Sequence, residues 1–124
     1  MNLASFAVPA LLLLALAAPA LAQDAVKVDA KHYKVEFENA KVRVLHATYA
    51  PHEKSVMHSH PDAVAVFLTD GKVRFTFANG KTQDADAKAG TAMWNPATTH
   101  LPENVGDKAF EVMVIELKGK AAKK

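Results

Sequence analysis

The stretch MHSHP at residues 57–61 is the part of the chain from which its fold and site can be worked out. In an extended strand, successive side chains alternate between two faces, so His58 and His60 are expected on the same surface. Two neighbouring imidazoles suit a metal ion, and imidazole favours Zn, Cu, Fe and Ni over Mg or Ca. His100, far downstream, is a third candidate ligand. Because His-x-His also occurs on solvated strand faces, the surrounding sequence must decide between the two interpretations.

The residues that follow the histidine pair extend the pattern. Three residues separate His60 from Val64, and six more separate Val64 from Gly71. This spacing resembles the first motif of the cupin superfamily, which runs glycine, five residues, His-x-His, three or four residues, glutamate, six residues, glycine. The chain departs from that motif at two places. Val64 and Ala65 stand where the family's metal-binding glutamate is expected, and His52 replaces the opening glycine.

A second pattern surrounds the distant histidine. Gly90 is followed by five residues and Pro96, and His100 is followed by three residues and Asn104. The spacing resembles the second cupin motif, although the segment from Pro96 to His100 is one residue shorter and lacks the inner glycine. The resemblance covers roughly residues 40–117. It implies a cupin fold, namely an antiparallel β-barrel or jelly-roll sandwich, in which His58, His60 and His100 would bind one divalent metal.

Hydrophobic periodicity predicts an all-β domain without reference to any family. Apolar and polar residues alternate with a period of two in most segments, and residues 63–68 form a continuous apolar run typical of a buried strand. Short segments joined by Asp-Gly and Asn-Gly turns indicate an antiparallel sandwich or barrel. Strands are predicted at residues 33–38, 42–49, 56–60, 63–68, 72–77, 81–87, 91–95, from residue 100, and at 110–117.

The ends of the chain differ from this domain. Residues 4–20 carry no charge and precede the small-x-small sequence Ala-Leu-Ala at 20–22, so residues 1–22 are interpreted as a secretory signal peptide cut before Gln23. An uncleaved membrane anchor is the alternative, but the run is short and is interrupted by Pro9 and Pro19. We therefore expect a cupin-like domain at 23–117 and a basic, disordered tail at 118–124. The protein would be periplasmic or secreted, with no stable membrane anchor after cleavage.

Composition restricts the partners. The chain has 124 residues, which suggests one domain, and its formal net charge of +2 is too small to indicate binding to nucleic acid. It has no cysteine, which excludes disulfides and thiolate ligands. A domain this small depends on core burial and on any help from a metal or a second copy. The family resemblance implies a homodimer.

Four further residues are expected to line a pocket beside the histidines. His46 lies on the predicted strand before the motif, and it would approach the vacant ligand position if its face looks inward. Otherwise it is a hydrogen-bonded core histidine. Val64 occupies the position of the missing glutamate. Met93 and Trp94 either pack in the core or form a wall of the pocket, because small-molecule sites are mostly apolar with a few polar groups.

The remaining histidines and nearby carboxylates are assigned to the surface. We expect solvent-exposed or turn positions for this set: His32, His52, Glu53, Asp62 and Glu103.

Three neutral imidazoles around a divalent ion leave one or more coordination positions for water or substrate. With no carboxylate ligand, the ion keeps its full double charge and would polarise a carbonyl or lower the pKa of bound water. Cysteine dioxygenases and diketone-cleaving dioxygenases are cupins with three histidines and no glutamate, so the resemblance implies a metal-dependent oxygenase. An isomerase that uses the metal as a Lewis acid is the other enzymatic interpretation, and either enzyme would act on a small molecule. The alternative is a non-catalytic small-ligand-binding or structural cupin. The expected cofactor is Fe, Zn, Mn, Ni or Cu.

Overall fold

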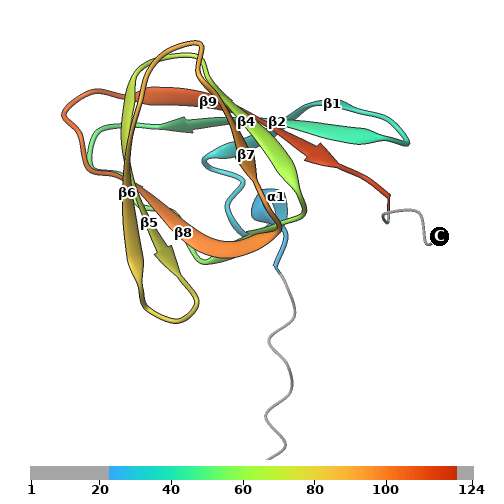
Figure 1. Ribbon diagram of the computed structural model, residues 1–124, viewed down its shortest axis with the longest axis horizontal. Helices are drawn as coiled ribbons and strands as arrows, with labels where there is room; N and C mark the ends of the chain where they lie inside the picture. Colours follow the sequence, from blue (N-terminus) through green and yellow to red (C-terminus); the bar gives the residue numbers. More distant parts are fainter. Residues whose placement is uncertain (1–22, 120–124) are drawn as a thin grey trace, which may run out of the picture.

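The computed structural model describes residues 23–119 (Figure 1). The predicted signal peptide at 1–22 and the last five residues of the predicted tail lie outside this range. No helix in the described part is both long and apolar enough to cross a membrane. Over residues 23–119, one short helix is followed by nine strands: α1 (Ala25–Val28), β1 (Tyr33–Glu38), β2 (Val42–Tyr49), β3 (His58–His60), β4 (Ala63–Phe67), β5 (Gly71–Phe77), β6 (Thr82–Ala87), β7 (Ala92–Asn95), β8 (Thr98–Asn104) and β9 (Phe110–Leu117).

The strands form two antiparallel sheets. One has five strands in the order β1-β2-β9-β4-β7, and the other has four in the order β3-β8-β5-β6. Figure 1 shows the two sheets facing each other around a common interior. The prediction of an all-β antiparallel fold is confirmed. Within residues 23–119 the strand pairing does not run continuously around the interior, so the structure is a two-sheet sandwich and not a closed barrel.

The alternation of side chains along β9 shows how the core is built. Phe110, Val112, Val114 and Glu116 are buried, whereas the residues between them are only partly buried. The same alternation in β4 buries Ala63, Ala65 and Phe67. Apolar side chains on the inner face provide most of the stabilisation, since burying one of them contributes roughly 1.5–3 kcal/mol. A carboxylate at position 116 is the exception on this face.

Several boundaries differ from the predicted ones. β3 contains only residues 58–60, and β8 begins at Thr98, two residues before His100. α1 was not predicted because four residues are too few to show helical periodicity. Asp24 caps it, since the Asp24 carboxylate accepts a hydrogen bond of 2.9 Å from the backbone N–H of Val26.

Two glycines in the predicted turns have different roles. Gly80 has a φ of 82°, a conformation that glycine adopts without steric cost. Gly71 has no such dihedral. A Cβ at Gly71 would lie 3.0 Å from the Cβ of Phe110 and 3.2 Å from the Phe67 ring, so glycine is needed there for close packing. The Asp-Gly pair at 70–71 therefore marks a packing constraint as well as the beginning of β5.

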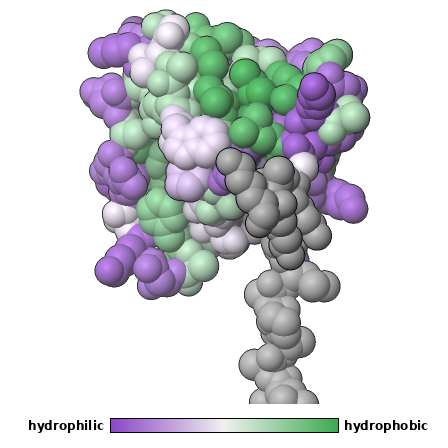
Figure 2. Space-filling view, turned by 45° about the vertical axis from the view of Figure 1, so that its right-hand side comes forward, coloured by the Kyte–Doolittle hydropathy of each residue, from purple (hydrophilic) through white to green (hydrophobic). Residues whose placement is uncertain are grey.

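The outer face of the five-stranded sheet carries a row of apolar side chains. The strand register places Phe37 opposite Val44, Val44 opposite Ile115, Ile115 opposite Val64, and Val64 opposite Trp94. The two ends of this row are the most exposed, Phe37 at 54% and Trp94 at 57%. Figure 2 shows hydrophobic residues gathered on one side of the molecule. Contiguous apolar surface of this kind marks an interaction site more often than an isolated exposed residue does.

Candidate metal centre

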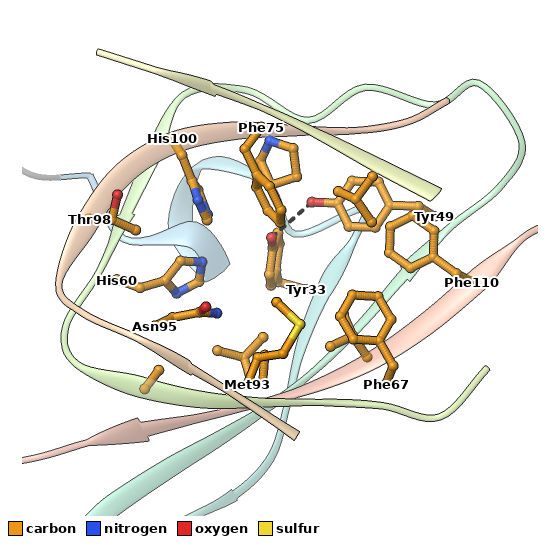
Figure 3. A pocket seen from close by; sticks show the side chains of 16 residues that line it. Tyr33, Tyr49, His60, Phe67, Phe75, Met93, Asn95, Thr98, His100 and Phe110 are labelled. Carbon is orange, nitrogen blue, oxygen red and sulfur yellow. Dashed lines mark hydrogen bonds between the residues drawn. The ribbon is translucent and has the colours of Figure 1, made fainter. Parts of the chain in front are cut away.

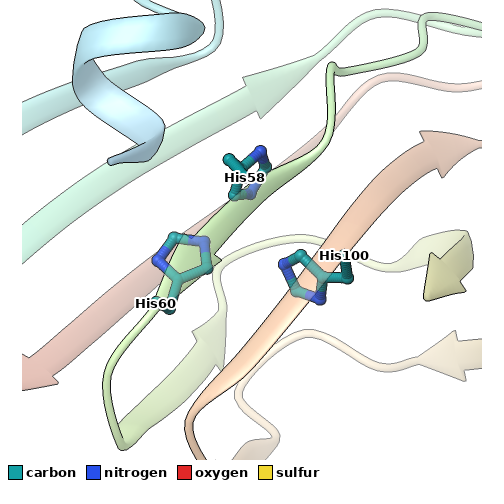
Figure 4. Close-up of side chains that lie close together, drawn as sticks. All are labelled: His58, His60 and His100. Carbon is teal, nitrogen blue, oxygen red and sulfur yellow. The ribbon is translucent and has the colours of Figure 1, made fainter. Parts of the chain in front are cut away.

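Pairing between β3 and β8 brings the three histidines together. His58 lies directly opposite His100 in the ladder, and His60 is two residues further along β3 on the same face. Ligand nitrogens from the three side chains all lie within 4.8 Å of one another. The side chains are buried, with residue exposures of 0%, 8% and 7% for His58, His60 and His100. Figure 4 shows the pair on one strand and the third imidazole reaching toward it from the neighbouring strand. The expected convergence of a distant histidine with the pair is present.

Hydrogen bonding fixes the tautomers of the first two histidines. Nδ1 of His58 lies 2.8 Å from the carbonyl oxygen of Val56, and a carbonyl can only accept, so Nδ1 carries the proton. Nδ1 of His60 lies 2.7 Å from the Glu116 carboxylate and donates to it in the same way. In the neutral form of each imidazole, the Nε2 lone pair is therefore free. This is the tautomer that a metal ion requires at Nε2.

Two of these nitrogens are buried without a partner. Among the described residues, Nε2 of His58 and Nε2 of His100 have no hydrogen-bond partner and no contact with solvent. Leaving a buried polar atom unsatisfied costs about 1–3 kcal/mol. A metal ion would satisfy both atoms at once, together with Nε2 of His60. The residues present thus fit a metal with three nitrogen ligands.

Electrostatics keep His58 and His100 neutral. Burial, followed by repulsion from His60, lowers the pKa of His58 to about 4. Burial and the other two histidines lower the pKa of His100 to about 3. Both imidazoles are uncharged at pH 7, which is the form that binds metal. No proton has to be displaced from either ring before an ion enters.

Glu116 links His60 to two further charged residues, Arg43 and Asp24. Its carboxylate accepts from Nδ1 of His60 at 2.7 Å and from Nε of Arg43 at 2.7 Å, and Arg43 also pairs with Asp24 at 2.7 Å. Burial would raise the pKa of Glu116, but the hydrogen bonds from His60 and Arg43 outweigh it and hold the pKa below its ordinary value. Glu116 is therefore ionised, and it orients His60 without occupying a position among the three nitrogens.

An apolar cavity adjoins the histidines (Figure 3). Its volume is about 40 Å³, which is enough for two or three water molecules. Tyr33 lies between His60 and His100 on one side and the aromatic side chains of Tyr49 and Phe110 on the other (Figure 3). The Tyr49 hydroxyl donates to the Tyr33 hydroxyl at 2.9 Å. Burial raises the pKa of Tyr33 well above its ordinary value, so its own hydroxyl keeps a proton to donate to a ligand in the cavity.

A wider hollow lies beside this cavity. Its volume is about 290 Å³, and it shares Phe75, Met93, Asn95, Thr98 and His100 with the inner cavity. Phe75 stacks on His100 with ring centroids 5.1 Å apart, which holds the imidazole in the wall between the two spaces. Among residues 23–119, none that lines either space is Asp, Glu, Lys or Arg. The described surroundings of the candidate metal centre are therefore uncharged.

The expected pocket residues fall in different places. Met93 lines the cavity. Val64 and Trp94 alternate onto the outer face of the sheet, and Trp94 only borders the wider hollow. His46 also lies on the outer face. Its Nδ1 is 3.1 Å from Glu36 and its Nε2 is 2.8 Å from Glu111, so both nitrogens are occupied far from the metal centre. His46 does not fill the vacant ligand position, because its strand parity points it away from the core.

Sequence reasoning missed the residues that support the histidines. Glu116 has the same strand parity as Phe110, Val112 and Val114, and a carboxylate at a core position is the signal that identifies it. His32 is buried at 6% exposure, contrary to its surface assignment, and its Nδ1 is 2.7 Å from Asp29. No periodic pattern precedes the first strand, so nothing in the sequence indicated that this segment packs inward.

These features define a small two-sheet β protein with a buried three-histidine cluster that fits a metal ion. Residues 45–116 match the Cupin_2 family model, described as a cupin domain, so the chain belongs to the cupin family. A search of curated proteins found no match.

Solved structures agree with this assignment. A cupin domain from Bordetella pertussis is 25% identical with a TM-score of 0.65, and the match covers 70% of this chain and 92% of that one. A Klebsiella pneumoniae protein with a double-stranded β-helix domain is 22% identical with a TM-score of 0.57, covering 73% and 74%. A cupin superfamily protein from Desulfitobacterium hafniense is 18% identical with a TM-score of 0.53, covering 68% and 74%. The last two similarities concern the fold alone.

Proposed function

We propose that the protein binds one divalent transition metal through Nε2 of His58, His60 and His100. The observation that carries this proposal is the pair of buried, unpartnered Nε2 atoms beside a third whose tautomer is fixed for coordination. Imidazole ligands are compatible with Fe, Zn, Ni and Cu, and Mn remains among the expected ions by family resemblance. Three protein ligands leave at least one position open, as in metal sites that act on small molecules.

The lining of the site indicates the class of ligand. A bound ion would act as a Lewis acid toward an oxygen or sulfur donor. Tyr33 carries a hydroxyl proton in the adjoining cavity, and Phe75 and Met93 contribute apolar walls to the same cavity. Because the walls carry no charged side chain, we propose a small ligand with a metal-binding oxygen or sulfur at one end and an apolar body.

We propose catalysis of the oxygenase or isomerase type as the use of this site. The wide hollow supports this proposal, because it borders His100, one of the three proposed ligands. A cupin that binds its ligand without transforming it is the alternative. Oxygen uptake by the iron-loaded protein with a panel of thiols and diketones separates the two. Turnover supports the enzyme, and stoichiometric ligand binding with no turnover under any metal supports the binding protein.

The metal proposal has a direct test. Untagged protein, purified without chelators, is expected to contain about one transition-metal ion per chain by elemental analysis. A His58→Ala/His60→Ala double variant is expected to lose the metal, because a single remaining imidazole does not hold an ion. His46→Ala, which removes a histidine from the outer face, is the matched control and should retain it. Equal metal content in the double variant and the wild type would rule out this assignment.

We also propose that the protein is exported and then acts outside the cytoplasm. The support is the sequence of residues 1–22, interpreted as a cleavable signal peptide. Mass spectrometry of the protein isolated from its native cells would show a mature chain that begins at Gln23. A chain that retains its first 22 residues would contradict the proposal.

A further inference from the structure

The segment before the matched domain lies against the strand that carries the histidine pair. The family match begins at residue 45, yet α1 contacts β3. The backbone N–H of Ser59, between the two histidines, donates to the carbonyl of Gln23 at 2.7 Å. Asp24 forms a parallel bridge with Ser59. Figure 4 shows the helix beside the strand of His58 and His60. Residues 23–33, here called the N-terminal segment, are therefore placed to act on both ligands.

One chain of hydrogen bonds runs from this segment to His58. Asp29 is buried, and its carboxylate accepts a short hydrogen bond of 2.5 Å from the Ser55 hydroxyl. Since that hydroxyl gives its proton to Asp29, its lone pairs face Nδ1 of His58 at 3.3 Å. Ser55 thus joins the Val56 carbonyl in accepting from Nδ1. Asp29 is held in turn by Nδ1 of His32 at 2.7 Å. The chain keeps the proton of His58 on the nitrogen that faces away from the site.

A second, separate chain runs from the same segment to His60. One oxygen of Asp24 caps α1, and the other lies 2.7 Å from the Arg43 guanidinium. Arg43 donates from Nε to Glu116 at 2.7 Å, and Glu116 accepts from His60 at 2.7 Å. Arg43 is therefore held by carboxylates at both ends. Without Asp24, one end of the guanidinium would be free to turn, and Glu116 would lose the rigid partner that orients it.

We propose that Asp24 and Asp29 are positioning residues of the metal centre, each fixing one member of the His-x-His pair through its own chain of hydrogen bonds. This inference rests on the proposed metal binding. Groups that orient a metal-binding histidine typically change metal affinity by about 10–100-fold when they are replaced. The N-terminal segment is then part of the site even though it lies outside the region matched by the family.

The test uses the untagged full chain, stripped of metal, and Zn²⁺ in competition with a chromogenic chelator. Asp29→Asn and Asp24→Asn keep the side-chain size and remove the charge, and each should weaken Zn²⁺ binding by about 10–100-fold. The matched control is Asp84→Asn, which breaks an exposed aspartate–arginine pair with Arg74 between strands β6 and β5 and should leave the affinity unchanged. Because the two chains share no residue, the double variant should weaken Zn²⁺ binding more than either single variant does.

A second readout separates positioning from general loss of structure. The visible spectrum of bound Co²⁺ reports ligand geometry and should change in both variants, while their unfolding remains cooperative. If Asp29→Asn folds poorly, Ser55→Ala replaces it in the test. Ser55→Ala removes only one hydroxyl from the same chain of hydrogen bonds and should weaken Zn²⁺ binding in the same way. The inference is overturned if both variants bind Zn²⁺ as Asp84→Asn does with an unchanged Co²⁺ spectrum. If the wild type itself fails to bind Zn²⁺ and Co²⁺, the proposed metal function falls, and the inference falls with it.

Discussion

Strand β9 carries two glutamates that each bind a histidine, one on either face of the same sheet. Glu116 on the inner face accepts from His60 at 2.7 Å, and Glu111 on the outer face accepts from His46 at 2.8 Å. The distances are nearly the same, but the side chains differ in exposure, at 2% for Glu116 and 42% for Glu111. The difference lies in what surrounds each pair.

The surroundings decide what each pair can do. On the inner face, Glu116 takes one nitrogen of His60 and leaves the other beside two more imidazoles. On the outer face, Glu36 and Glu111 take both nitrogens of His46, so none remains for a metal. A histidine–carboxylate contact is therefore insufficient to define a site. The inner pair matters because its second nitrogen is free and other ligands converge on it.

Replacing the two glutamates should give the largest contrast. Glu116→Ala leaves Arg43 and His60 without their buried acceptor, and breaking such a pair typically costs about 3–5 kcal/mol. Glu111→Ala removes a half-exposed contact worth about 0–1 kcal/mol. Urea unfolding of the metal-free proteins measures both free energies. Metal content should fall with Glu116→Ala and remain with Glu111→Ala, and similar losses in the two variants would show that burial does not distinguish the pairs.

Acid should act on the inner face in a defined pH window. The folded-state pKa values of His58 and His100 are about 4 and about 3, below the ordinary value of 6.5. Between pH 6.5 and 4 the unfolded chain binds more protons, so the free energy of unfolding falls as the pH falls. The slope is about 1.4 kcal/mol per pH unit for each histidine. The lowered pKa of Glu116 adds to the loss at still lower pH.

Urea unfolding of metal-free protein at pH 7, 6 and 5 tests this expectation. His100→Asn removes one of the two groups and should reduce the slope by about half between pH 6 and pH 5. Stability that is constant from pH 7 to pH 5 in the wild type would show that the inner histidines are protonated as easily in the folded protein as in the unfolded one.

Much of the fold follows from the sequence because strand alternation is a local property. The segments around Val35, Val44 and Val114 have a period of two that requires no knowledge of their partners. The histidine pair and His100 were also identified from the sequence, but only the family spacing linked them. β8 was predicted to start too late, because Pro96 and the threonines after it resemble a loop and the pairing with β3 that orders Thr98 is a long-range contact.

The residues that support the histidines were harder to predict, because their contacts also depend on long-range strand pairing. Arg43 and Glu116 are 73 residues apart, and their contact depends on the register between β2 and β9. Trp94 was assigned to the pocket without knowledge of strand parity, which turns it outward opposite Val64. A one-residue change of register exchanges the two faces of a strand, so the facing of a short strand is the least secure part of such a prediction.

The smallest effect on the inner site is expected from changes to the outer face of the five-stranded sheet. We propose that two copies pair through the row Phe37, Val44, Ile115, Val64 and Trp94. Ile115 lies at its centre, so a two-fold axis parallel to β9 places Phe37 of one copy against the partner's Trp94. A five-stranded face is roughly 24 Å across at about 4.8 Å per strand. The area of this face is of the order of half the roughly 800 Å² that each partner buries in a standard interface. The flanking strands must therefore contribute, and the affinity of the two copies for each other should be moderate.

Ile115→Asp tests this pairing and sharpens the contrast between the faces. A buried charge at the centre of the row should convert the dimer to a monomer in sedimentation experiments, and Trp94 fluorescence should shift to longer wavelength as its ring meets water. Metal content and the acid sensitivity should be unchanged, because they belong to the inner face. Thr82→Asp on the other sheet is the control. A wild type that sediments as a monomer at micromolar concentrations would exclude this dimer and leave the inner site unaffected.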